Sequence, residues 1–143
     1  MGWLKAAAAA VFGASAAPQH LEQLVVELEV VEATPPTLLL RVRNPGPAPA
    51  RFCRWHTPLE GSSSRFLEVR GPDGGALRYH GVMRKRGAPT AEDFVDLAPG
   101  ATAEARFALG ADYGPLPAGP LTVRFVGTPG VNGLPDSAAV VIE

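Results

Sequence analysis

The sequence predicts an all-β protein, an immunoglobulin-like antiparallel β-sandwich of about eight or nine short strands. Three observations lead to this fold class. Apolar and polar residues alternate over short runs, most clearly in residues 21–31 and 37–43. The 16 glycines and 15 prolines exceed a fifth of the 143 residues and follow no period, which indicates frequent turns. No amphipathic helix is recognisable after residue 17.

The composition fits one ordinary globular domain, which we place at residues 17–143. The chain is 46% hydrophobic and 19% charged, with a formal net charge of -1. Because both signs are interspersed, there is no general field to attract nucleic acid or an anionic membrane. We therefore expect no nucleic-acid partner, and we expect a monomer when the protein is free.

The first 16 residues read as a secretory signal peptide. Lys5 supplies positive charge, residues 6–13 are apolar, and Ala14-Ser15-Ala16 provides small residues for cleavage. The apolar run is shorter than the ~20 residues that span a bilayer. No cysteine stands directly after the cleavage site, so we expect no lipoprotein-type membrane anchor and an exported, periplasmic or extracellular protein. The alternative is a structural alanine-rich helix.

Two strands are predicted at the start of the domain. In residues 21–31, Leu24, Val26, Leu28 and Val30 share one face and the intervening glutamates the other. Residues 37–43 alternate in the same way. Further strands are expected at 51–55, 66–69, 76–79, 94–97, 101–109, 121–126 and 137–142, with an Asp-Gly hairpin turn between 69 and 76.

The most unusual stretch is the charged loop of residues 80–93. It contains the basic triplet Arg84, Lys85 and Arg86, followed by Thr90 and the acidic pair Glu92 and Asp93. A loop of this length in a compact domain is usually functional or disordered. We interpret these six residues as a surface that binds a protein partner; the alternative is a loop kept in solvent by its charge.

A second loop follows the strand at 51–55 and contains His56, Thr57 and Glu60, which we take as a secondary part of the site. Trp55 is expected in the core, as is common for a tryptophan in sandwiches. Cys53 is the only cysteine, so no internal disulfide is possible, and we expect it to be a small buried apolar residue.

The sequence offers little catalytic chemistry. It has no H-E-x-x-H, no G-x-S-x-G and no phosphate-binding glycine loop. Cys53 and His56 have C-x-x-H spacing, but no second pair completes the three or four ligands of a zinc site. A Cys-His nucleophile would need something to lower the thiol pKa. We therefore expect no metal, no cofactor and no enzymatic activity.

The chain contains, in this order, W-x-T-P-L-E-G at residues 55–61, K-R-x-x-P-T-A-E-D-F at 85–94 and L-x-P-G at 97–100, with Asp112-Tyr113 before a later strand. These blocks resemble the amino-terminal domain of secreted deuterolysin-type (aspzincin) zinc endopeptidases. The resemblance extends over roughly residues 24–126. One departure is Gly119-Pro120-Leu121, where the family usually has an aromatic residue after the glycine.

In that family the domain is a propeptide β-sandwich that assists folding of the catalytic domain and keeps it inactive. The resemblance implies a propeptide-like, non-catalytic domain that binds a secreted zinc endopeptidase as inhibitor or folding chaperone. Lys85 or Arg86 would enter a specificity pocket, and Glu92 or Asp93 would lie near the partner's metal. The alternative is a general immunoglobulin-like interaction module of the cell envelope, which would bind through a sheet face or edge.

Overall fold

The computed structural model describes residues 24–61, 64–83 and 85–143. The predicted signal peptide and Arg84 lie outside these residues. The described chain is an all-β fold with one turn of α-helix, α2 (Gly110–Tyr113), and two turns of 3-10 helix, η1 (Pro58–Glu60) and η2 (Ala91–Asp93). The strands are β1 (Val25–Ala33), β2 (Pro36–Arg43), β3 (Ala50–Cys53), β4 (Leu67–Arg70), β5 (Phe94–Leu97), β6 (Thr102–Ala108), β7 (Leu121–Phe125) and β8 (Val140–Ile142).

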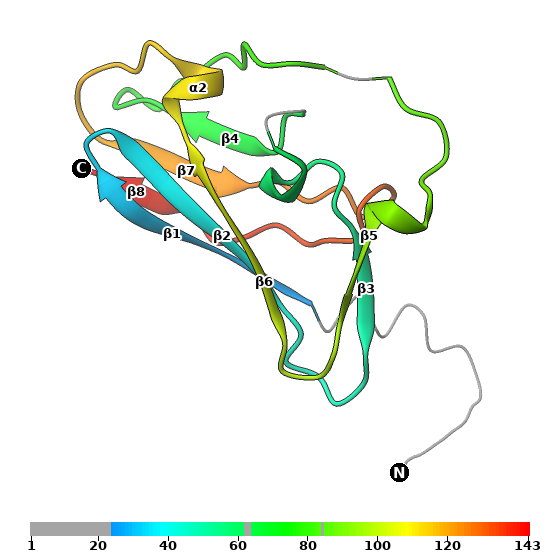
Figure 1. Ribbon diagram of the computed structural model, residues 1–143. Coiled ribbons are helices and arrows are strands. Elements are labelled where there is room, and N and C mark those ends of the chain that lie inside the picture. The colour runs from blue at the N-terminus through cyan, green and yellow to red at the C-terminus, as the bar shows by residue number, and fades with distance from the viewer. Residues whose placement is uncertain (1–23, 62–63, 84) are drawn as a thin grey trace.

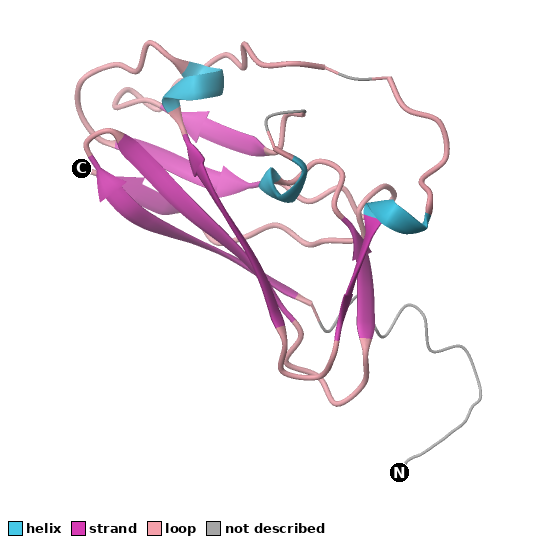
Figure 2. Ribbon diagram, viewed as in Figure 1, coloured by secondary structure: helices cyan, strands magenta, loops and turns pink. Residues whose placement is uncertain are grey.

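These strands form three antiparallel sheets (Figures 1 and 2). The sheet orders are β1-β2-β6, β3-β5 and β4-β7-β8. The first sheet is fixed by the pairing of Leu28 with Leu40 and of Leu40 with Ala105. The all-β prediction is therefore confirmed. The finer, immunoglobulin-like arrangement stays a prediction, because the strands pair in three sheets.

The core forms where the inner faces of the sheets meet. Leu38, Leu40 and Val42 of β2 are fully buried, as are Val123 and Phe125 of β7. Leu24, Val26 and Leu28 are buried too, and Val30 is partly buried against them. The alternation predicted for the first two strands is thus confirmed by burial. The outward residues pair across the sheet: Arg41 makes salt bridges of 2.7 Å with both Glu29 and Glu104.

A buried asparagine joins the loops at one end of the sheets. The Asn44 side chain donates to the carbonyl oxygens of Ala48 (2.8 Å) and Leu97 (3.0 Å). Its backbone carbonyl accepts from Gly100, 2.7 Å away. The β2–β3 connection and the β5–β6 turn, both at the lower end of Figure 1, are held together in this way.

The strand predicted at 76–79 is not formed. Only one bridge, between Arg70 and Ala76, follows the turn, with a hydrogen bond of 2.8 Å from Leu77 N to Val69 O. The chain then leaves the sheet because His80 donates to the carbonyl oxygen of Asp112 (2.7 Å). The predicted strand at 51–55 is also shorter, ending at Cys53, since His56 adopts a φ of 57°.

Within the part of the chain that the structure describes, no helix has the length and apolar character to cross a membrane.

Candidate functional site

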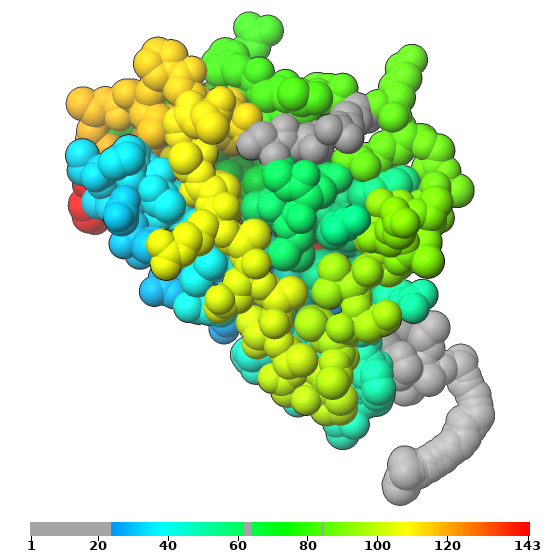
Figure 3. Space-filling view, viewed as in Figure 1, coloured from blue at the N-terminus to red at the C-terminus, as the bar shows by residue number. Residues whose placement is uncertain are grey.

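The charged loop of residues 80–93, called the arm below, lies on the surface. It runs along the upper and right-hand edge of the molecule, from the neighbourhood of α2 to η2 (Figures 1 and 3). Val82 is 55% exposed and Met83 is 77% exposed. Lys85, Thr90 and Glu92 are also exposed. The arm therefore presents two neighbouring apolar side chains and a lysine to solvent.

The amino-terminal end of the arm is anchored by two tyrosines. The Tyr79 hydroxyl donates to the carbonyl oxygen of Val82 (2.5 Å), and its ring meets the ring of Tyr113 with centroids 5.7 Å apart. Tyr113 in turn donates to the carbonyl oxygen of Leu67 at 3.0 Å. Burial raises the pKa of Tyr113 to about 12, so this hydroxyl stays a hydrogen-bond donor at neutral pH.

The middle of the arm is anchored by Arg86. Its guanidinium carbon lies 4.5 Å from the centre of the Trp55 ring, and it forms a salt bridge with Glu60. The two side chains of this pair are only 17% and 9% exposed. A planar guanidinium can stack on the tryptophan face and pair with a carboxylate at the same time. The ammonium group of a lysine is not planar and cannot make both contacts in this geometry.

The second loop is the base for this anchor. Glu60 accepts hydrogen bonds from the backbone N–H of His56 (2.7 Å) and the hydroxyl of Ser64 (3.0 Å). The buried Thr57 hydroxyl accepts from Leu59 N, which caps η1, and donates to the carbonyl oxygen of Arg54. The structure thus brings the two predicted loops together, since Arg86 of the arm contacts Glu60 of the second loop.

Asn132, which the sequence did not single out, holds the second loop from behind. Its side-chain amide donates to the carbonyl oxygen of Trp55 (3.1 Å) and lies 3.4 Å from that of His56. Its side-chain oxygen accepts from the backbone of Thr128 and of Leu134. A lone asparagine in a Gly- and Pro-rich segment gives no sequence signal of burial, so only the fold identifies it.

Thr90 and Asp93 stabilise the turn η2. The Asp93 carboxylate accepts from the backbone N–H of Thr90 at 2.8 Å, and Asp93 N donates back to Thr90 O. The hydrogen bond from Thr90 lowers the pKa of Asp93. The buried Trp55 indole N–H has no hydrogen-bond partner among the described residues. It still lies near enough to the Asp93 carboxylate to help lower the pKa of Asp93.

Cys53 is buried, as predicted, and burial raises the pKa of its thiol. The Nδ1 atom of His56 lies 3.3 Å from the Thr128 hydroxyl. Among residues 24–61, 64–83 and 85–143, no group of three or more His, Cys, Asp or Glu side chains could hold a metal ion.

No protein-family model matches this chain, and no curated protein matches it. The case for a site therefore rests on the geometry of the described residues and on the sequence motifs.

Proposed function

We propose that this protein is an exported, non-catalytic domain that binds another protein through its arm. One observation carries the proposal: Val82 and Met83 are exposed in the short stretch between the two anchors, at Tyr79 and at Arg86. Neighbouring exposed apolar residues are typical of protein-binding surfaces, and methionine adapts to a partner's shape. Anchoring this stretch on both sides reduces the conformational entropy lost on binding.

We further propose a secreted zinc endopeptidase as the partner, with this domain acting as inhibitor or folding chaperone. The support is the resemblance of residues 55–61 and 85–94 to the propeptide domains of such enzymes. The structure distinguishes the two basic residues of this segment. Arg86 stacks on Trp55 and pairs with Glu60 within the fold. Lys85 is exposed and is therefore the better candidate to enter a cleft of the partner.

The alternative, binding through a sheet face, has less support. Among the described residues four large apolar side chains are exposed, namely Val82, Met83, Val131 and Val141. Only Val141 lies on a strand, in β8, and it is 51% exposed. A single apolar side chain is not an interaction patch, so the arm is favoured.

The proposal is tested with a purified secreted zinc endopeptidase whose catalytic domain has been freed of its own amino-terminal domain. We expect this protein to bind it and to slow peptide hydrolysis. The double variant Val82→Ser, Met83→Ser and the single variant Lys85→Ala should each weaken binding at least tenfold, which corresponds to about 1.4 kcal/mol.

Val131→Ser is the matched control, because Val131 is 44% exposed and lies outside the arm. It should bind as the wild type does. Unchanged inhibition by both arm variants would show that the arm is not the binding surface. Absence of binding would refute the assignment of the partner.

A further inference from the structure

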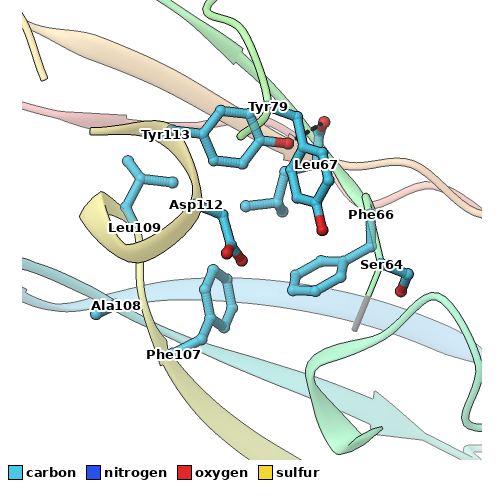
Figure 4. Close-up of a pocket in the computed structure, with 9 residues that line it drawn as sticks. All are labelled: Ser64, Phe66, Leu67, Tyr79, Phe107, Ala108, Leu109, Asp112 and Tyr113. Carbon is cyan, nitrogen blue, oxygen red and sulfur yellow. Dashed lines mark hydrogen bonds between the residues drawn. The ribbon is translucent and has the colours of Figure 1, made fainter. Parts of the chain in front are cut away.

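A small pocket lies beside the amino-terminal anchor of the arm. Its walls include the aromatic rings of Phe66, Phe107, Tyr79 and Tyr113, and the Asp112 carboxylate points into the space between them (Figure 4). The space between the lining residues, including the part open to solvent, is about 210 Å³. It has room for about one group the size of a water molecule.

The aromatic walls are held in position by their own contacts. Phe66 and Phe107 meet edge to face, with ring centroids 5.4 Å apart and an interplanar angle of 89°. Both tyrosine hydroxyls donate to backbone carbonyl oxygens, of Val82 and of Leu67. Neither hydroxyl therefore needs the Asp112 carboxylate as its acceptor.

The Asp112 carboxylate is uncompensated. It makes no hydrogen bond or salt bridge with the described residues, although its backbone is fixed by bonds with Leu109 and His80. Burial raises its pKa, and no positive charge within residues 24–61, 64–83 and 85–143 counters this effect. The exposed Arg65 lies near the Tyr113 hydroxyl and lowers the pKa of Tyr113 against the larger effect of burial. A half-buried carboxylate with no partner is an unfavourable arrangement that a bound cation would relieve.

We propose that this pocket binds a primary ammonium group, supplied by a lysine side chain of the protein partner. An ammonium is close to water in size, pairs with a carboxylate and is attracted by aromatic rings. A guanidinium or trimethylammonium group is too large for the space. A single carboxylate among carbon atoms is also a poor site for a hard metal ion, which takes several oxygen ligands.

The source of the ammonium follows from the position of the pocket. Tyr79, which forms one wall, is hydrogen-bonded to Val82, one of the two exposed apolar residues of the arm. A partner chain lying on Val82 and Met83 would pass the pocket at close range. The choice of a lysine of a protein partner therefore rests on the proposed function, whereas the preference for an ammonium rests on the pocket alone.

The test uses the free protein and small probes, so it does not depend on the partner. Three probes are titrated while the amide NMR signals of the protein are followed. They are lysine capped by an acetyl group on its backbone nitrogen and by a methylamide, the same compound trimethylated on the side-chain nitrogen, and the matching norleucine compound. Only the first should shift the signals of residues 79–81 and 112–113 in a saturable way. Asp112→Asn should weaken this binding at least tenfold.

Asp73→Asn is the control, because it removes an equal charge from an exposed turn and keeps an acceptor for Gly75 N. It should leave the lysine affinity unchanged. Equal shifts with norleucine or with trimethyl-lysine, or undiminished binding by Asp112→Asn, would overturn the proposal. Asp112→Asn is expected to fold normally, and its thermal unfolding midpoint is measured alongside.

The two proposals fail separately. If lysine binds the pocket but the arm variants inhibit the endopeptidase as well as the wild type does, the ammonium site stands and the proposed function falls. If the arm variants lose inhibition and lysine causes no shift, the pocket is not an ammonium site and the arm proposal stands.

Discussion

Buried asparagines hold the loops of this protein in place. Asn44 and Asn132 are both almost fully buried, and each joins chain segments far apart in the sequence. An amide that both donates and accepts can satisfy several backbone groups that would otherwise be buried without a partner. At the scale of single residues, Asn44 fixes two turns at one end of the sheets and Asn132 connects the core with the candidate site.

We predict that Asn132→Ala lowers the free energy of unfolding by about 2–4 kcal/mol. The substitution leaves the carbonyl oxygen of Trp55 and the N–H groups of Thr128 and Leu134 without their partner, at about 1–3 kcal/mol for each group that stays dry. Urea unfolding measures the change. A loss below about 1 kcal/mol would show that water replaces the amide.

The Arg86 anchor should contribute strongly to stability. Arg86→Ala removes the stacking on Trp55 and leaves Glu60 with a largely buried charge, so we expect a loss of about 2 kcal/mol or more. Arg51→Ala is the matched control. Arg51 also pairs with a carboxylate, Asp96, and lies 5.3 Å from the Phe94 ring, but its side chain is 59% exposed.

The control should lose much less stability than Arg86→Ala, because solvent screens exposed pairs. Equal losses in chemical unfolding of the two variants would contradict the anchor. A double-mutant cycle between Arg86→Ala and Glu60→Gln isolates the pair, and a coupling energy near zero would lead to the same conclusion.

The pH dependence of stability should separate Asp112 from the other acidic groups. Its folded pKa is raised above the ordinary value of 3.8, so its contribution is most favourable below that pH and is lost as the pH rises through the folded value. Asp112→Asn should therefore be at least as stable as wild type at pH 7, with the difference disappearing in acid.

The pKa values of Glu68, Asp93 and Asp96 are shifted in the opposite direction from that of Asp112. Hydrogen bonds from Arg124, Thr90 and Arg51 lower their respective pKa values. Their stabilisation is present at neutral pH and is lost as the pH falls through the folded pKa values, which lie below 4.5 and 3.8. Thermal unfolding of wild type and Asp112→Asn from acid to neutral pH measures both trends. A destabilised Asp112→Asn at pH 7 would contradict the uncompensated carboxylate.

At the scale of the elements, the turn between β5 and β6 depends on a glycine. Gly100 has a φ of +79°, and its N–H donates to Asn44 O. We predict that Gly100→Ala lowers the free energy of unfolding by about 1 kcal/mol, because an L side chain is strained in this conformation. Gly130→Ala, where the added methyl meets open space, should be neutral. Similar values for the two variants in urea unfolding would refute the argument.

Strand periodicity was predictable because it is local. The faces of β1 and β2 follow from alternation alone, and the Leu-Ala-Pro-Gly turn at 97–100 marks the start of β6. The strand expected at 76–79 does not form for a non-local reason, because the backbone N–H of His80 bonds to the carbonyl oxygen of Asp112 and the chain is drawn away from the sheet. Local alternation carries no information about a competing partner more than thirty residues away.

The candidate site was predictable as two separate loops but not as one structure. The charges of the arm and the composition of the second loop are visible in the sequence. The contact of Arg86 with Trp55 and Glu60 depends on how the loops pack. The pocket around Asp112 also needs the fold, because its lining comes from the start of β4 and the residues before it, from β6, from α2 and from the segment before the arm.

At the scale of the whole molecule, the sheets share one core and the arm crosses their edge between two fixed points. The core combines residues of all three sheets. The arm contributes no fully buried residue among those described. A rigid base with an exposed, anchored segment is an arrangement suited to recognition, and the account depends on that segment meeting the partner.

Amide hydrogen exchange, compared between the free protein and the protein mixed with the zinc endopeptidase proposed as its partner, tests this most directly. We predict that binding slows exchange in residues 81–89 and leaves the exposed edges of β6 and β8 unchanged. Slower exchange along β6 or β8 with an unaltered arm would contradict the account and would favour binding through a sheet edge.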